Sequence, residues 1–363
     1  MSFKTGIDEI KKLVISIDPA RYASSRNFKK GAVSKLGPYI SRGTLSTKKI
    51  YHHIKSTGVQ WYKAEKYIQE LAWRDYWQQV WKSKQQLIFS DLKRPQEDVE
   101  CYDVPKAIIE ADTTIEALDE AIKEMYQSGY MHNHMRMYVA SICCNIAKRH
   151  WSNPAKWMYF HLLDGDLASN MLSWQWVAGS NSGKKYLANQ SNINKFFESR
   201  QKGTFLDRNY EELGNIAMPE PLKQGIFFEE KSSLTSFTSD EIQPNKKTLI
   251  YNYYNLDPEW ETDQDVQRIF LIEPSIFEKY PVSQKCLNFA LALSKNIPNC
   301  QLFIGEFWDL KEKLGTAEIA YKEHPLNKNY QGTEVSRDWL SSVTGYYRSF
   351  FSFWKQCKKE LIW

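Results

Sequence analysis

Long apolar stretches are missing from this 363-residue sequence. No run approaches the roughly 20 apolar residues that a membrane-spanning helix needs. The opening, MSFKTGIDEIKK, also lacks the apolar segment of a secretory signal. We therefore expect a cytoplasmic protein that does not associate with membranes.

Cysteine is also scarce, with six residues that form neither a CxxC pair nor a dense framework. They are Cys101, Cys143, Cys144, Cys286, Cys300 and Cys357. This spacing fits a reduced interior and argues against a disulfide scaffold and against a zinc or iron–sulfur site. We predict that the protein binds no metal.

Tryptophan and charge are distributed unevenly along the chain. Eight of the 13 tryptophans lie between residues 61 and 176. Residues 1–200 carry 29 Lys and Arg against 20 Asp and Glu, whereas residues 201–363 carry 19 against 23. A basic, aromatic-rich half favours contact with a polyanion or an anionic cofactor. A solvated basic surface explains the charge equally well.

The hydrophobic pattern changes near residue 246. Before it, periodicity predicts helices at 6–18, 47–90, 113–128, 131–150 and 154–162. After it, strands are predicted at 248–253, 268–273, 300–305 and 317–321, with helices at 283–295, 308–314 and 338–360. Alternating strands and helices indicate a small, largely parallel α/β unit. The predicted domains are a helical one at 1–215, a linker at 216–246 and the α/β unit at 247–363.

Four segments combine residue types that carry chemistry. The first runs from Tyr22 to Tyr39, where small residues before a helix start leave backbone N–H groups that suit phosphate. The second, ELAWRDYW at 70–77, places a Glu, an Arg and two Trp on one helical face. The third is MHNHMRM at 131–137, and the fourth is DGDLASN at 164–170, followed by WQWVAG at 174–179. Taken singly, each also fits an ordinary loop, cap or core stripe.

Taken together, these segments resemble the FAD-binding domain of the photolyase/cryptochrome family over roughly residues 20–180. That family carries YxxxRDF…TSRLSPYLATG, (N/Q)ELxWREF, MHNRxRM and DGDLAxNxxxWQWxAG in the same order. The resemblance implies a mainly α fold, with an all-helical photolyase-type FAD-binding domain followed by a small reduced α/β unit. The chain resembles a short form that lacks the family's N-terminal antenna domain.

The resemblance implies FAD as the cofactor, and we expect no second antenna chromophore. Within the matched positions, Arg136 is expected to pair with Asp164, and Asn170 to lie beside flavin N5. The expected cofactor-binding residues are Tyr22, Val33, Ser34, Lys35, Leu36, Gly37, Trp73, Arg74, Asn133, Arg136, Asp164, Gly165, Asp166 and Asn170.

The same resemblance assigns a catalytic set and a DNA side. The catalytic set is Trp174, Trp151, Glu70 and Asn170, with Trp174 and Trp151 as the first two members of an electron-transfer chain. The residues expected to face DNA are Glu70, Trp73, Trp77, Asn133, His134, Met137, Trp176, Lys184 and Lys185. Met137 stands where cyclobutane-type enzymes carry Met.

Several positions depart from the family pattern. The third, surface tryptophan of the electron-transfer chain has no match, which leaves Tyr102, Tyr130 and Trp157 as candidates. His134 replaces an Arg, and VSKLG at 33–37 replaces TSRLS. The family's YFRIFNP motif is absent, and GKKYLANQSNINK at 183–195 stands in its place. In that segment Lys195 is a further candidate for phosphate contact and Tyr186 for base stacking, and a solvated loop explains it equally well.

The resemblance favours a monomeric photolyase-like lyase that repairs cyclobutane pyrimidine dimers in single- or double-stranded DNA. The alternative is a cryptochrome-like blue-light photoreceptor without repair activity. A third possibility is a nucleic-acid-binding protein that has lost its photochemistry.

Overall fold

The computed structural model describes residues 3–262 and 265–363. These residues form two compact units, each assembled from separate parts of the chain. The first unit comprises residues 18–33 and 83–229, and the second comprises 3–17, 34–82 and 230–363. The predicted boundaries at 215 and 246 stay a prediction.

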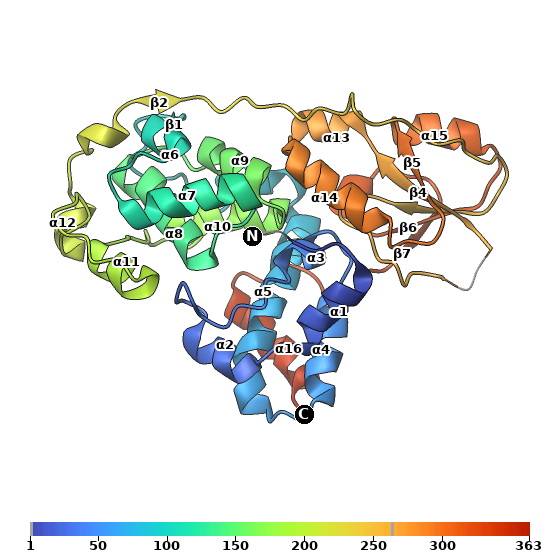
Figure 1. The fold of residues 1–363 in the computed structure, drawn as a ribbon, viewed down its shortest axis with the longest axis horizontal. Helices are drawn as coiled ribbons and strands as arrows, with labels where there is room; N and C mark the ends of the chain where they lie inside the picture. Colours follow the sequence, from blue (N-terminus) through green and yellow to red (C-terminus); the bar gives the residue numbers. More distant parts are fainter. Residues whose placement is uncertain (1–2, 263–264) are drawn as a thin grey trace. The chain divides into compact units, whose positions relative to one another are not determined.

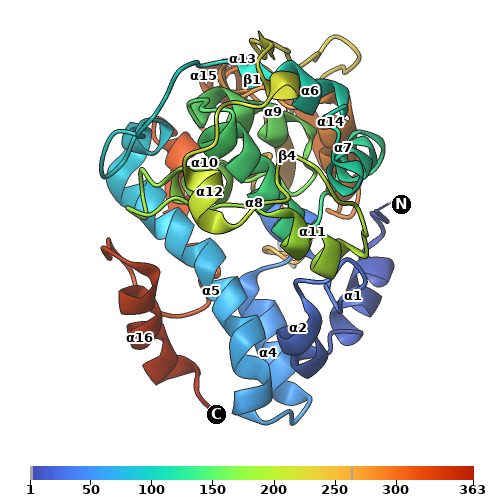
Figure 2. The ribbon, with the colours of Figure 1, turned by 90° about the vertical axis from the view of Figure 1, so that its left-hand side faces the viewer.

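The first unit is helical and is built around three helices. Helix α10 (Leu167–Ala178) packs against α8 (Asn133–Ser141) and α9 (Ser152–His161), and Figure 2 shows the three together. A π-helical turn, η2 (Ile142–Ile146), extends α8. The remaining elements are α2 (Pro19–Ser25), η1 (Gln85–Phe89), β1 (Val104–Pro105), α6 (Lys106–Glu110), α7 (Glu116–Ser128), α11 (Gln190–Phe197), α12 (Tyr210–Gly214), η3 (Glu220–Leu222) and β2 (Gly225–Ile226).

Two glycines end helices of the first unit and thereby position its motifs. Gly129 closes α7 with a φ of 73°, and Gly179 closes α10 with a φ of 90°. Glycine adopts this left-handed conformation without the penalty that a Cβ would add. The two glycines therefore end α7 just before the motif at 131–137 and end α10 at the last residue of the motif at 174–179.

The second unit combines helices with a five-stranded parallel sheet of order β5-β4-β3-β6-β7 (Figure 1). Its strands are β3 (Thr248–Tyr251), β4 (Gln267–Ile272), β5 (Cys300–Ile304), β6 (Ile319–Lys322) and β7 (Thr333–Val335). Its helices are α1 (Ile7–Ile15), α3 (Gly37–Ser41), α4 (Thr47–Ser56), α5 (Trp61–Lys84), α13 (Pro274–Lys279), α14 (Gln284–Ser294), α15 (Phe307–Leu314), η4 (Pro325–Asn327) and α16 (Phe350–Leu361).

The sheet is the doubly wound type, because the chain builds outward from β3 in one direction and then in the other. Helix α15 packs on one face through Phe307, Leu310 and Leu314, against Ile269 of β4 and Ile319 of β6. The strand order changes direction between β3 and β6, and such switch points place loops from both strands at one edge. The predicted fold class, mainly α with a small parallel α/β unit, is confirmed.

Three predicted elements were wrong in their extent. The helix predicted at 338–360 begins only at Phe350, because Ser349 caps it and Gly345 has a φ of 89°. The helix predicted at 47–90 is interrupted at 57–60, where Gly58 has a φ of 74°, and its last turn is a 3-10 helix. The helix predicted at 131–150 starts at Asn133 and ends at Ile146.

Residues 3–262 and 265–363 contain no helix that is long and apolar enough to cross a membrane. Within the same residues, no group of three or more His, Cys, Asp or Glu could hold a metal ion. All six cysteines are free thiols.

Candidate functional site

Some of the predicted site residues belong to the second unit and the others to the first. The second unit holds Ser34, Lys35, Leu36, Gly37, Glu70, Trp73, Arg74 and Trp77. The first unit holds Tyr22, Val33, Asn133, His134, Arg136, Met137, Trp151, Asp164, Gly165, Asp166, Asn170, Trp174, Trp176, Lys184 and Lys185.

The predicted phosphate-binding turn precedes the short helix α3. Lys35 has a φ of 55°, a left-handed conformation that turns the chain sharply before Gly37. Ser34 Oγ accepts a hydrogen bond of 2.9 Å from the Tyr67 hydroxyl. Burial raises the pKa of Tyr67 to about 12, so this hydroxyl stays protonated and keeps donating. The turn is thus tied directly to α5.

Two charged residues of the α5 motif have partners within the second unit. Glu70 Oε1 lies 2.7 Å from Lys66 Nζ, one helical turn earlier, and the Glu70 side chain is 34% exposed. Arg74 donates a hydrogen bond of 2.7 Å from Nη1 to Ser41 Oγ of α3. The Glu–Lys pair leaves Glu70 accessible, whereas the Arg74 bond joins the motif to the helix after the phosphate turn.

The tryptophans of the α5 motif lie in an aromatic cluster. Phe350, the first residue of α16, stacks on Trp73 with ring centroids 3.7 Å apart and planes 10° apart. Trp77 is only 8% exposed and packs against Trp73 and Tyr76. One face of Trp73 is therefore covered by a ring from the C-terminal helix. The sequence analysis missed Phe350, although the aromatic run at 346–354 was visible.

In the first unit, Arg136 and Asp164 form the ion pair that the resemblance predicts. Arg136 Nη2 lies 3.0 Å from Asp164 Oδ2, and the two side chains are 19% and 12% exposed. Arg136 Nε also donates to the Met131 carbonyl at 2.8 Å. These contacts fix the guanidinium between the start of α8 and the turn before α10.

The DGDLASN segment forms the turn into α10. Asp166 is the N-cap, and its Oδ1 accepts from the Ser169 N–H at 2.8 Å. A Cβ on Gly165 would lie 2.9 Å from the Leu162 carbonyl oxygen, so only glycine fits there without a shift. Ser169 Oγ is buried and has no hydrogen-bond partner among the described residues. The sequence analysis quoted Ser169 but gave it no role.

Asn170 follows on the first turns of α10, and its amide has a defined orientation. Its Nδ2 donates a hydrogen bond of 2.9 Å to the Ala155 carbonyl of α9. Since a carbonyl can only accept, the nitrogen must face Ala155, and Oδ1 is the acceptor directed elsewhere.

His134 does not replace the charge of the arginine that the family carries. Its Nδ1 lies 3.2 Å from the Asn27 carbonyl, and its ring packs against Phe196 and Tyr138. Burial lowers the pKa of His134 below its usual value, which favours the neutral ring. The neighbouring Asn133 is exposed at the start of α8, and Met137 is half-buried.

The tryptophans of the first unit differ in exposure. Trp151 is fully buried and Trp174 is 3% exposed, whereas Trp176 is 39% exposed and lies near Tyr186. Lys184 is exposed, and Lys185 pairs with Asp98. Trp176 and Lys184 are thus exposed members of the predicted DNA side, as Asn133 is.

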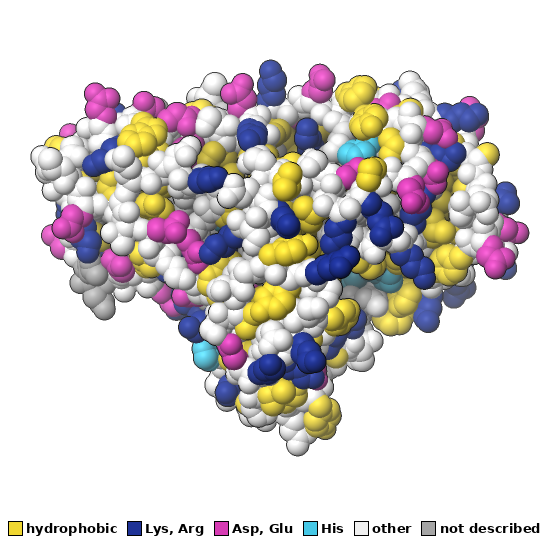
Figure 3. All heavy atoms as spheres, turned by 180° about the vertical axis from the view of Figure 1, so that it is seen from behind, with side chains coloured by type: hydrophobic (Ala, Val, Ile, Leu, Met, Phe, Trp, Pro, Cys, Tyr) yellow, Lys and Arg dark blue, Asp and Glu magenta, His cyan; other side chains and the backbone are white. Residues whose placement is uncertain are grey.

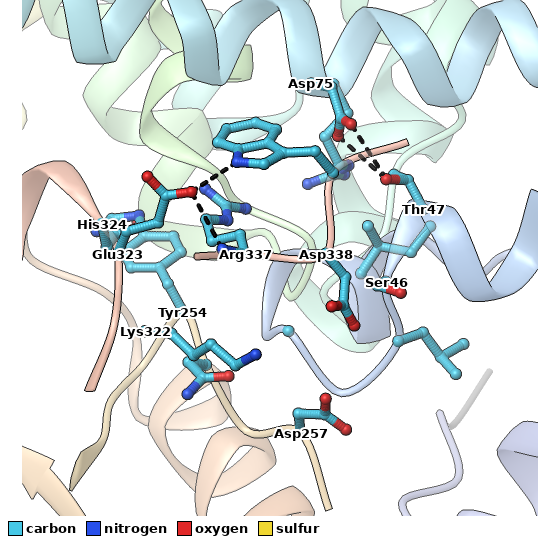
Figure 4. A pocket seen from close by; sticks show the side chains of 16 residues that line it. Ser46, Thr47, Asp75, Tyr254, Asp257, Lys322, Glu323, His324, Arg337 and Asp338 are labelled. Atoms are coloured by element: carbon cyan, nitrogen blue, oxygen red, sulfur yellow. Dashed lines mark hydrogen bonds between the residues drawn. The ribbon is translucent and has the colours of Figure 1, made fainter. Parts of the chain in front are cut away.

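A pocket that is open to solvent lies in the second unit (Figure 4). Part of its lining follows the strands β3, β6 and β7 and includes Tyr254, Glu323 and Arg337. The rest includes the start of α4 and two residues of the α5 motif, Arg74 and Asp75. Much of its polar lining is internally paired. Glu323 accepts from the Trp339 indole N–H at 2.6 Å, and Asp75 accepts from the Leu340 N–H at 2.7 Å.

Residues 67–226 match the family model described as the FAD binding domain of DNA photolyase. This segment is similar to a photolyase-type FAD-binding domain. The matched range includes the α5, α8 and α10 motifs described above, and it leaves the phosphate turn and the α/β sheet outside.

Several known proteins are similar to parts of this chain. A deoxyribodipyrimidine photo-lyase of Streptomyces griseus is 33% identical over 151 residues, which cover 41% of this chain and 32% of the relative. One of Alkalihalophilus pseudofirmus is 29% identical over 167 residues, covering 43% and 34%. A solved cryptochrome of Synechocystis shares 23% identity over 54% of this chain and 44% of its own, with a TM-score of 0.48. The chain matches about a third of the length of these two curated relatives.

Proposed function

We propose that this protein is a light-driven DNA-repair flavoprotein that splits cyclobutane pyrimidine dimers by electron transfer from reduced FAD. The observation that carries the proposal is the arrangement at the start of α10. There the Arg136–Asp164 pair and the oriented Asn170 amide lie within a photolyase-type FAD-binding segment. The relatives of this segment named above include two deoxyribodipyrimidine photo-lyases.

The residues present fit FAD. The buried Ser169 hydroxyl has no partner among the described residues, and a ligand with many hydrogen-bonding groups would supply one. Arg136 and Asn170 add a fixed cation and a fixed amide to the same region. When bound, reduced FAD would supply the electron that splits the dimer under light. Tyr22 and residues 33–37 are the proposed contacts of its phosphate region.

Each side chain then has a definite role. Asn170 presents Oδ1, which can accept a hydrogen bond from a protonated ring nitrogen. It would therefore favour the reduced, protonated form of a flavin ring over the oxidised form. The Arg136–Asp164 pair sets the local field and limits access of water, since both side chains are largely buried. Gly165 lets the backbone turn close to Tyr159 without a side chain in the way.

The DNA side of the proposal depends on Glu70, Asn133 and Met137, which would contact the flipped dimer. Glu70 is the best placed for a test, because its side chain is 34% exposed and its ion pair with Lys66 is of a kind that water readily competes for. Several Lys and Arg side chains also lie on the lower part of the face in Figure 3, among fewer Asp and Glu side chains. Affinity for DNA is therefore expected to fall steeply with salt.

The test is an illuminated repair assay. FAD-loaded, reduced protein is mixed with an oligonucleotide that contains thymine dimers, and recovery of the thymine absorbance is followed in light and in darkness. We expect recovery in light, and loss of recovery in Glu70→Ala. Glu65→Ala, on the same helix but outside the matched segment, is the control and should retain repair. Dimers that persist after long illumination of the wild type would contradict the proposal.

A cryptochrome-like photoreceptor without repair is the second candidate, and two observations favour it. Phe350 covers one face of Trp73, which is among the residues expected to face DNA. His134 is packed among aromatic rings where repair enzymes of the family carry an Arg. Light-dependent flavin reduction without dimer recovery would select this candidate, whereas a colourless protein that takes up no FAD would exclude both.

We also propose that FAD is the only chromophore. The internal pairing of Glu323 and Asp75 in the second-unit pocket supports this, because these groups have no unmet need for a ligand. Extraction of the purified protein and chromatography of the released pigments tests it. A second pigment in stoichiometric amount would contradict it. A monomeric state and a cytoplasmic location stay predictions.

A further inference from the structure

Residues 100–103, a short segment of the first unit, are bonded to residues 148–150, which lie just before α9. Glu100 N–H donates to the Lys148 carbonyl at 2.8 Å, and His150 N–H donates to the Cys101 carbonyl at 2.8 Å. The Arg149 guanidinium lies 2.9 Å from Asp103. Backbone bonds on one side and an ion pair on the other hold the intervening residue, Tyr102, in a fixed position.

Tyr102 ends a series of touching aromatic rings. Its ring stacks on His150 with centroids 5.1 Å apart and planes 27° apart. His150 in turn lies 5.5 Å from Trp151, at 36°. Trp151 is fully buried, whereas Tyr102 is 59% exposed. Because electron tunnelling falls off steeply with distance, rings in contact form the favoured route between a buried indole and the surface.

Trp151 is also better prepared than Trp157 to carry positive charge. Its Nε1 donates to Asp91 Oδ1 at 2.7 Å, so a carboxylate lies directly against the group that loses an electron. The Nε1 of Trp157 donates instead to the neutral hydroxyl of Tyr126, at 3.0 Å. An adjacent negative charge stabilises an oxidised indole, and a neutral hydroxyl does so much less.

The other candidates for the third position are placed less well. Trp157 is fully buried and therefore does not reach solvent. The Arg136 guanidinium lies 5.8 Å from the Tyr130 ring, so its positive charge disfavours oxidation of that ring. Of the three candidates, Tyr102 is the one that combines exposure with ring contact toward Trp151.

We propose that Tyr102 is the terminal electron donor of this chain, with His150 as the ring that connects it to Trp151. The proposal rests on the FAD site of the proposed function, and its oxidant would be FAD bound there in the oxidised form and excited by light. Trp174 gives one electron to that oxidant, Trp151 restores Trp174, and Tyr102 restores Trp151. Tyr102 loses one electron to Trp151 and its phenol proton to water, which leaves a neutral tyrosyl radical. A soluble thiol then returns one electron and one proton to it.

The experiment compares FAD-loaded wild type with Tyr102→Phe, Tyr102→Trp and Tyr126→Phe. Transient absorption and EPR follow the radicals after a light pulse, and a nitroso spin trap with peptide mass spectrometry locates them. We expect a tyrosyl radical in the wild type, with the trap attached to Tyr102. Tyr102→Phe should lose this signal and leave a short-lived tryptophan radical. Tyr102→Trp should regain a long-lived radical, now on tryptophan, and Tyr126→Phe should behave like the wild type.

The outcomes separate this proposal from the proposed function. A light-induced tryptophan radical without a tyrosyl radical, or a tyrosyl signal that persists in Tyr102→Phe, would overturn the role of Tyr102 and leave the flavin photochemistry intact. Loss of the signal in Tyr126→Phe would move the route to Trp157. If no radical forms in loaded wild type, the proposal for Tyr102 fails, and the illuminated repair assay on reduced protein still decides the proposed function. A purely structural role for Tyr102 is excluded if Tyr102→Trp restores the long-lived radical.

Discussion

Helices α5 and α10 both carry tryptophan-rich motifs, yet their surroundings are built in different ways. On α10, the motif residues are held by near neighbours, since Asp166 bonds to Ser169 and Asn170 bonds to Ala155. On α5, the ring of Trp73 is covered by Phe350, which comes from the far end of the chain. A motif that depends on local contacts forms whenever its own segment folds, whereas one that depends on a distant helix can be altered without any change in the motif.

The largest expected effect concerns the distant contact on α5. Phe350→Ala removes a ring that is 3% exposed and stacked on Trp73. We expect a loss of about 3–5 kcal/mol in the free energy of unfolding, because the variant leaves a cavity in an aromatic core. Urea titration followed by tryptophan fluorescence measures it. Phe351→Ala, at an adjacent ring that is 68% exposed, is the matched control and should change stability by less than about 0.5 kcal/mol.

The second largest effect on stability is expected for the ion pair between Arg136 and Asp164, just before α10. Asp164→Asn removes the negative partner of Arg136, whose guanidinium is only 19% exposed. We expect a loss of about 3 kcal/mol, since a largely buried cation is left without its carboxylate. The comparison is Glu120→Gln, which breaks the exposed pair with Lys29 and should cost about 0–1 kcal/mol. Equal effects of the two variants would show that burial of the Arg136 pair contributes nothing.

A buried carboxyl on α5 provides a smaller, pH-dependent effect. Burial raises the pKa of Asp75 from 3.8 to about 6. The folded state therefore binds more protons than the unfolded state between these values, and the wild type should lose stability as the pH rises from about 4 to 6. In Asp75→Asn, the free energy of unfolding should fall by about 2 kcal/mol less than in the wild type over this pH range. Urea midpoints measured across this range decide the matter, and parallel curves for the two proteins would refute it.

The smallest effect on stability is expected at Glu70, the residue on which the repair proposal depends most. Glu70→Gln breaks a partly exposed ion pair with Lys66 one turn away on α5. Such pairs contribute about 0.3–0.5 kcal/mol, so the thermal midpoint should hardly move. A much larger loss would assign Glu70 a structural role and weaken its use as a test of repair.

Much of the local structure could be predicted because it depends on nearby residues. The helices around 116–128 and 284–294 and the strands at 248–251, 267–272 and 300–304 follow from periodicity, and the structure places them within a few residues of their predicted limits. The helix predicted at 338–360 failed over its first half, because the apolar spacing there continues through Gly345 and the cap at Ser349. Short elements such as β7 and α11 were not predicted, since three to eight residues give too little pattern.

The sequence by itself determined the order of the motifs and the alternation of strands and helices in the C-terminal part. The pairing of Arg136 with Asp164 was predicted through the family resemblance. Only the tertiary structure decided that Phe350 covers Trp73, that Tyr102 stacks on His150, and that the strands run in the order β5-β4-β3-β6-β7. The physical reason is range. Periodicity and capping act over one or two turns, whereas contacts between distant segments depend on which buried surfaces fit one another once the chain has folded.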